Sequence, residues 1–98
     1  MTIVVTRNVP ERFRGFLASC MLELAPGVYT SPNINDAVRE RIWAVCCDWA
    51  GLLPSDSGVL MTWESLRMPG GQAVRTIGWP RKELAELDGI WLDRRLDP

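Results

Sequence analysis

The sequence predicts an α+β fold in which two helices cover one face of a small antiparallel sheet. Short apolar strand patterns alternate with two longer stretches whose apolar residues recur every three or four positions, and each of those stretches has a single apolar stripe. The 98 residues are expected to form one domain, residues 1–98, near the lower size limit for a self-sufficient hydrophobic core. Burial of surface in an oligomer would therefore add stability.

The N-terminal quarter predicts a strand followed by a helix. Residues 2–6 form a β-branched run typical of a buried strand. The helix should start near Pro10 and stop at Pro26 and Gly27. Its apolar stripe is predicted to comprise Phe13, Phe16, Leu17, Cys20, Met21 and Leu24. Arg12 and Arg14 lie about 100° to either side of Phe13, so both should flank the buried stripe.

The remaining elements follow in alternation. A second strand is predicted at residues 27–30, and Asn33 with Asp36 suggests the cap of a second helix that ends by residue 51. Residues 58–64 and 72–78 predict a hairpin, and residues 89–93 predict one more strand after a polar connection. The second helix should bury a stripe of Ile34, Val38, Ile42, Val45 and Trp49, with Trp43 nearly opposite.

This order of elements predicts a ferredoxin-like two-layer sandwich. It would hold an antiparallel sheet of about four strands, two helices on one face and an extra C-terminal strand. The uncovered face of the sheet needs a partner, and a second copy of the chain is the simplest one. Trp43, Trp63 and Trp79 are expected to supply aromatic surface for that contact.

Composition excludes several classes of function. The chain has no histidine, which removes Ser-His-Asp and Cys-His catalysis and every zinc site that needs imidazole. Its three cysteines are odd in number and lack a CxxC spacing, so they are expected to be reduced core or flanking residues. No apolar run approaches the length of a membrane span and no secretory signal is visible, so a cytoplasmic protein without membrane contact is expected.

The basic residues point to phosphate. Net charge is −1, but ten of the eleven basic residues are arginine, and the first cluster lies where the first strand gives way to the helix. A guanidinium group offers several donors in a fixed fork, and a helix start favours an anion. An ordinary solvated helix flank remains the alternative for Arg12 and Arg14. Arg39 and Arg41 are expected to pair with Asp36 or Glu40 on their own helix.

Several short fragments follow one another in a fixed order and spacing: Ile3-Val4-Val5-Thr6; Asn8-Val9-Pro10 with Arg12, Arg14 and Gly15; Leu22-Glu23 with Gly27-Val28-Tyr29; Arg39-Glu40; Ile42-Trp43; and Gly78 with Arg81-Lys82 before Leu87-Asp88-Gly89. In these fragments the chain resembles CRISPR-associated protein 2 of the type I-E kind over nearly its whole length. Each fragment is short, but their order and spacing together are specific.

The resemblance implies a ferredoxin-like homodimer held between two dimers of the integrase subunit, CRISPR-associated protein 1. A protospacer duplex would lie across it, and the chemistry would belong to the partner. Carried over by position, the DNA-binding residues are Arg12, Arg14, Arg81 and Lys82, joined by Arg7 and Asn8 at the end of the first strand. The C-terminal region, residues 87–96, would dock on the integrase subunit through Leu87, Ile90, Trp91, Leu92 and Arg94. No catalytic residue, metal ligand or cofactor is assigned.

Two other functions remain open from the sequence. Many relatives of this kind carry a metal-binding carboxylate at the end of the first strand, and some have been assigned metal-dependent endonuclease activity on RNA or DNA. Here that position holds Arg7, which supplies no oxygen ligand for Mg²⁺, and the nearest acid is Glu11 on the helix. The third hypothesis is a ferredoxin-like interaction module without any role on nucleic acid.

Overall fold

The computed structural model describes the backbone of residues 1–78, 82–87 and 90–95, and the side chains of residues 1–78. No helix in this described part of the chain is long and apolar enough to cross a membrane. The elements, in chain order, are β1 (Thr2–Arg7), α1 (Glu11–Cys20), β2 (Leu22–Ala25), β3 (Val28–Ser31), α2 (Asp36–Asp48), the 3₁₀ turn η1 (Ala50–Leu52), β4 (Gly58–Glu64), the 3₁₀ turn η2 (Pro69–Gly71), β5 (Gln72–Ile77), β6 (Lys82–Leu87) and β7 (Ile90–Arg95).

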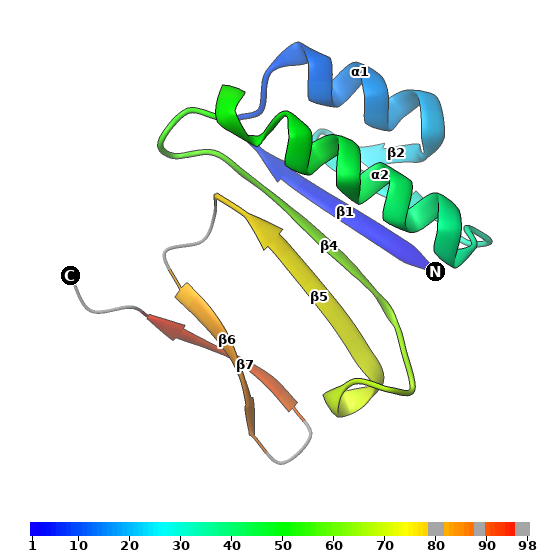
Figure 1. The fold of residues 1–98 in the computed structure, drawn as a ribbon, viewed down its shortest axis with the longest axis vertical. Coiled ribbons are helices and arrows are strands. Elements are labelled where there is room, and N and C mark those ends of the chain that lie inside the picture. The colour runs from blue at the N-terminus through cyan, green and yellow to red at the C-terminus, as the bar shows by residue number, and fades with distance from the viewer. Residues whose placement is uncertain (79–81, 88–89, 96–98) are drawn as a thin grey trace.

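Five strands form one antiparallel sheet in the order β2-β3-β1-β4-β5. The central strand β1 pairs with β3 on one side and with β4 on the other. Figure 1 shows α1 and α2 on the same face of this sheet. The first four strands have the ferredoxin-like order, and β5 extends the sheet beyond β4. The predicted two-layer α+β sandwich with an extra strand is therefore confirmed.

The core lies between the helices and the face of the sheet that carries Val4 and Tyr29. Those two residues are register partners, and Val4 is also paired with Met61, so all three side chains project to the same side. Alternate side chains of a strand point to opposite faces, and these three helix-facing side chains are fully buried. The buried cluster comprises Val4, Phe13, Leu17, Met21, Tyr29, Ile42, Cys46, Val59 and Met61.

Helix α2 buries part of the predicted stripe: Ile42 is in the core, and Ile34 and Trp49 pack against it. Its fully buried residues are Ile42 and Cys46, whereas Val38 is 44% exposed. The N-cap is Asn35, whose side-chain oxygen accepts a hydrogen bond from the backbone N–H of Val38 at 2.8 Å, and not the predicted Asn33. The buried face is centred on Ile42 and Cys46, and Trp43 lies one helical turn before Cys46, so Trp43 packs against the core instead of opposite it.

The predicted first helix was too long. It ends at Cys20, and Met21 already has extended dihedral angles of φ −138° and ψ 162°. Leu22–Ala25 is strand β2, so Leu24 is 64% exposed on the edge of the sheet and not on a buried helical stripe. Pro26 and Gly27 are the two residues between Ala25 and its partner Val28. Proline followed by a glycine with φ 80° suits a tight β-turn, which is the sequence signal that the helical interpretation overlooked.

The C-terminal region differs from the single strand predicted there. Lys82–Leu87 and Ile90–Arg95 pair with each other as a separate two-stranded antiparallel sheet. In Figure 1 this hairpin lies beside the free edge of β5. The sequence signal for it was the Asp88-Gly89 dipeptide between two alternating segments, which favours a two-residue hairpin loop.

The face of the sheet opposite the helices is aliphatic and not aromatic. By strand alternation it carries the half-buried side chains of Ile3, Val5, Val28, Leu60 and Val74. Trp43 and Trp63, predicted to supply a dimer contact, instead pack against the helix-side core. Trp79 lies outside the described residues. A contact through the open face would therefore be made by aliphatic side chains.

Candidate nucleic-acid interface

Three chain segments meet at one end of the sheet. Strand β1 ends at Arg7, α1 starts at Glu11 four residues later, and β5 ends at Ile77. Arg7 is paired with Gly58, and Val59 with Ile77, so the ends of β1 and β5 lie at the same level. Two strand spacings, about 10 Å, separate them. The sheet topology thus brings the first arginine cluster close to the start of the segment that carries Arg81 and Lys82.

Asn8 shapes the connection between β1 and α1. Its backbone has φ 52°, in the left-handed region that asparagine tolerates better than most residues. Its side-chain Nδ2 donates a hydrogen bond to Oδ1 of Asp56 at 2.8 Å, which ties the connection to the loop before β4. Asn8 therefore has a structural role here, and its predicted contact with DNA stays a prediction.

Arg12 is exposed and lies over an aromatic ring. The carbon of its guanidinium group is 5.2 Å from the centre of the Trp49 ring, a cation–π distance. Trp49 in turn packs edge-on against Phe13 and Phe16, at centroid distances of 5.7 Å and 5.5 Å. The fully buried Phe13 thus fixes the tryptophan, and the tryptophan limits the positions open to Arg12. Sequence reasoning placed Trp49 on the buried stripe of the second helix and missed it as a support of this site.

Arg14 forms an ion pair with Glu11 one helical turn earlier. The side chain of Arg14 is 56% exposed, so water screens the pair and its contribution to stability is small. The hydrogen bond that Arg14 donates to Glu11 and the charge of that carboxylate raise the pKa of Arg14. Arg14 therefore stays protonated, and the pair uses one terminal nitrogen of a group that has further donors.

Carboxylates near this end of the sheet already have partners. Arg7 is exposed at the end of β1 and supplies no oxygen ligand. Asp56 accepts the hydrogen bond from Asn8, and Glu11 is paired with Arg14. Across residues 1–78, 82–87 and 90–95, no three acidic or cysteine side chains gather in a way that could hold a metal ion.

The second predicted basic pair follows β5. Arg81 lies outside the described residues, and Lys82 is the first residue of β6, with its side chain undescribed. Gly78, which ends the path of β5, has φ 73° and lies against the backbone of Ser57. Arg81 and Lys82 follow the end of β5 by no more than five positions, and their contact with DNA stays a prediction.

The residues predicted to bind the integrase subunit belong to the C-terminal hairpin. Leu87 ends β6 and pairs with Ile90 at the start of β7, and Trp91 and Leu92 follow on the same strand. Arg94 pairs with Glu83 in register. Residues 88–89 and 96 of the predicted docking region lie outside the described part. The hairpin is separate from the five-stranded sheet and presents its own edges, as a docking element would.

The second helix has one of the two predicted arginine pairs. Arg39 is paired with Asp36 at 2.8 Å, as expected. Glu40, however, binds Arg75 of β5 through both carboxylate oxygens, a long-range contact that local spacing could not reveal. Arg41 is exposed on the same helix. A cluster around Trp63, also unpredicted, joins Arg39 and Arg75 at the other end of the sheet.

The fold and this junction define a class: a small ferredoxin-like α+β protein with exposed arginines at its first strand-to-helix connection. Residues 1–92 match the family described as CRISPR-associated protein (Cas_Cas2CT1978). Because the match spans nearly the whole chain, the protein belongs to this family and is a CRISPR-associated protein of the Cas2 type. Membership implies a part in CRISPR adaptation and in antiviral defence, together with partners from the CRISPR machinery.

Proposed function

We propose that the protein is a non-catalytic, dimeric DNA-binding scaffold of the CRISPR adaptation complex, of the type I-E kind. It would hold a protospacer duplex so that the integrase subunit, CRISPR-associated protein 1, inserts it into the CRISPR array. Exposed Arg12 and Arg14 flank a fully buried Phe13 at the start of α1, and this is the observation that carries the proposal. Rigidly mounted guanidinium groups at a helix start suit the oxygens of a phosphate backbone.

Two copies would make the surface long enough for a duplex. The aliphatic face with Ile3, Val5 and Leu60 favours a second copy as its cover, because a small domain needs the added burial. Twofold symmetry would then repeat each arginine cluster on the partner. The distance between the two clusters would fix how a duplex lies and where its ends reach the integrase active sites.

Salt dependence tests the proposed interface. If about four basic side chains per subunit touch phosphate, a dimer neutralises roughly eight charges, and log affinity for duplex DNA should fall with log salt at a slope of about −7. Replacing Arg12, Arg14, Arg81 and Lys82 with alanine should flatten the slope and abolish spacer integration while co-purification with the integrase subunit persists. The measurements are titration of labelled duplex at several salt concentrations and an integration assay.

The control removes positive charge elsewhere. Arg41→Ala, at an exposed position on α2 away from α1, should keep the slope and integration of the wild type. A slope near zero for the wild-type dimer would refute a phosphate-dominated interface. Cleavage of RNA or duplex DNA by highly purified protein, abolished by a chelator and by Glu11→Ala, would instead establish the metal-dependent nuclease. Charge reversal at Arg14 and Arg81 that left DNA binding intact would favour a plain interaction module.

A further inference from the structure

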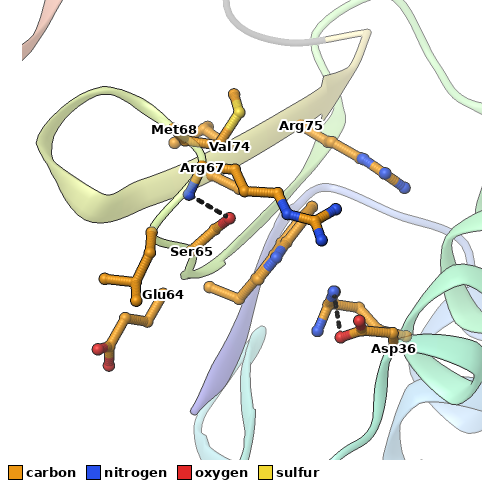
Figure 2. A pocket seen from close by; sticks show the side chains of 11 residues that line it. Asp36, Glu64, Ser65, Arg67, Met68, Val74 and Arg75 are labelled. Carbon is orange, nitrogen blue, oxygen red and sulfur yellow. Dashed lines mark hydrogen bonds and ion pairs between the residues drawn. The ribbon is translucent and has the colours of Figure 1, made fainter.

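A hollow of about 520 Å³ lies at the end of the sheet opposite the proposed duplex interface. It opens between the start of α2 and the hairpin of β4 and β5, and Figure 2 shows the side chains that line it. Arginines from three separate elements take part: Arg39 from α2, Arg67 from the hairpin loop and Arg75 from β5. The volume is within the range of pockets that hold a small ligand.

An indole ring joins two of these arginines. The guanidinium carbon of Arg39 lies 4.3 Å from the centre of the Trp63 ring, and that of Arg75 lies 5.0 Å from it. Guanidinium groups this close to a tryptophan ring interact with its π electrons. The side chain of Arg39 is only 12% exposed and is therefore held in place. The hollow thus has an indole ring with two guanidinium groups close to it, one of them largely buried.

The charges of Arg39 and Arg75 are balanced by helix α2. Asp36 accepts a hydrogen bond from Arg39 at 2.8 Å, and Glu40 accepts one from Nη2 of Arg75 at 2.7 Å. These pairs anchor the two guanidinium groups but remove most of their net charge. Any anion that enters the hollow must therefore be attracted mainly by the third arginine.

Arg67 is that third arginine, and it is exposed. Within the described residues its guanidinium group has no hydrogen bond or ion pair; its backbone N–H lies 3.4 Å from the hydroxyl oxygen of Ser65. The other acid that lines the hollow, Glu64, follows Trp63 along β4 and so points to the opposite face. Figure 2 shows the Glu64 carboxylate turned away from the guanidinium of Arg67.

The loop that carries Arg67 is braced by its own backbone. Ser65 N–H donates to the carbonyl of Gly71 at 2.8 Å, and Gly71 N–H donates to the carbonyl of Met68 at 3.0 Å. Leu66, at the tip between them, is 95% exposed. A loop closed by such bonds holds Arg67 beside the hollow before any ligand is bound. Binding there should therefore cost little further conformational entropy.

We propose that this hollow binds one nucleotide of a single-stranded nucleic acid. The phosphate would lie on the unpaired Arg67, and the base would stack on the surface formed by Trp63 and its two guanidinium groups. Single strands are bound in this way by basic grooves with aromatic platforms, because every base has a flat face. A carboxylate of an acidic peptide would satisfy Arg67 but would leave the stacking surface unused.

The site is separate from the proposed duplex interface. Arg7 and Trp63 mark opposite ends of the paired strands β1 and β4, which are about 17 Å apart for a six-residue strand. The hollow also lies on the helix side of the sheet, since Trp63 packs against the core. It would stay open if a second copy covered the other face.

Single-strand binding by Arg67→Ala tests the proposal directly. Arg67 is exposed and supports no described side chain, so the variant should fold as the wild type does. Its affinity for a labelled oligothymidylate, measured by fluorescence anisotropy, should fall about tenfold, the effect of one charged hydrogen bond. The salt slope should become shallower by about 0.7. Arg41→Ala, an exposed arginine on α2 away from the hollow, is the matched control and should bind as the wild type does.

A second readout locates the base. An oligonucleotide with 5-iododeoxyuridine, irradiated in complex with the wild-type protein, should crosslink to the peptide that contains Trp63. Unchanged affinity in Arg67→Ala, or crosslinks confined to other peptides, would overturn the proposal. So would displacement of the oligonucleotide by polyglutamate at an equal concentration of charge, which would identify an acidic-peptide site. Arg12→Ala with Arg14→Ala should weaken duplex binding alone, so failure of either interface is seen separately.

Discussion

Single side chains in this protein owe their roles to the neighbours that the fold gives them. Arg12 rests on Trp49, Arg14 pairs with Glu11, and Arg39 is almost buried over Trp63. The same guanidinium group is therefore a phosphate candidate at one position and a packing group at another. Two properties separate these uses: whether the side chain is exposed, and whether some of its N–H groups remain without a partner. By that measure Arg12, Arg14 and Arg67 are available to a ligand.

Gly78 offers a test at the scale of one residue. Its φ is 73°, and a Cβ atom there would lie 2.9 Å from the carbonyl oxygen of Ser57. Both the positive φ and the contact with backbone penalise a side chain, so Gly78→Ala should lower the free energy of unfolding by about 1–3 kcal/mol. Urea unfolding followed by circular dichroism measures the change.

The matched control is another glycine. Gly15 lies inside α1, and a Cβ there would meet nothing within 4 Å. Gly15→Ala should therefore raise the free energy of unfolding by about 0.5–1 kcal/mol, because alanine loses less backbone freedom than glycine in a helix. Equal midpoints for the two alanine variants would contradict the positions that the structure assigns to these glycines.

At the scale of elements, α2 is joined to the sheet by polar contacts as well as by its buried face. Glu40 of α2 binds both terminal nitrogens of Arg75 on β5. The described sheet has β5 as an edge strand, and this pair connects that edge to the helix layer. Arg39 over Trp63 adds a second link from α2 to β4. The hollow proposed to bind a nucleotide exists because these two links hold the helix end and the hairpin in place.

The link between Glu40 and Arg75 predicts a pH dependence of stability. The hydrogen bond from Arg75 lowers the pKa of Glu40 in the folded chain. Ionised Glu40 therefore stabilises the fold above its unfolded pKa, and this stabilisation is lost as pH falls through the lower folded value. The Glu40 side chain is 51% exposed, so the effect should stay below about 1 kcal/mol.

Unfolding free energies of wild type and Glu40→Gln at neutral pH and near pH 3 measure this effect. The variant should be less stable than the wild type at neutral pH and should lose less stability on acidification. Arg75→Gln and the double variant complete a thermodynamic cycle, in which the second substitution should add little to the first. Fully additive effects would show that the two side chains do not interact in solution.

At the scale of the whole molecule, the two faces of the sheet have different roles. The helix side holds the core, and the two arginine sites lie at its two ends. The opposite face carries aliphatic side chains, and neither helix covers it (Figure 1). The proposed dimer therefore uses the aliphatic face that the two helices leave open, and it leaves both arginine sites accessible.

Leu60→Glu tests the dimer. Leu60 lies on the open face between its partners Val5 and Thr76, so a charge there should prevent two copies from packing. Sedimentation velocity should show a dimer for the wild type and a monomer for the variant. Duplex binding by the monomer should have about half the salt slope, because half the phosphate contacts remain.

Val38→Glu is the control for this substitution. Val38 is 44% exposed on α2, on the helix side of the molecule. The same change of charge there should leave the dimer intact. A monomeric wild type, or loss of the dimer only in Val38→Glu, would show that the open face is not the contact between copies.

Local sequence patterns determined most of the framework: the class of fold, β1, the β4–β5 hairpin, and the helix start with its flanking arginines. These features depend on residues close in the chain, whose spacing is visible in the sequence. Two features that the sequence interpretation missed also have local signals. Pro26-Gly27 is the turn after β2, but helical spacing in the preceding residues favoured a longer α1. Asp88-Gly89 is a hairpin dipeptide, but the polar composition around it favoured an irregular connection.

The tertiary structure alone decided which distant residues meet. Trp49 contacts Arg12, which lies 37 positions earlier in the sequence, and Glu40 binds Arg75, which lies 35 positions later. Both contacts form because α2 runs along the sheet from one end to the other. The packing of α2 on the sheet through Ile42 and Cys46 placed Trp43 against the core, and strand alternation in β4 placed Trp63 on the helix side. Such contacts depend on strand order and helix orientation, which no short window of sequence contains.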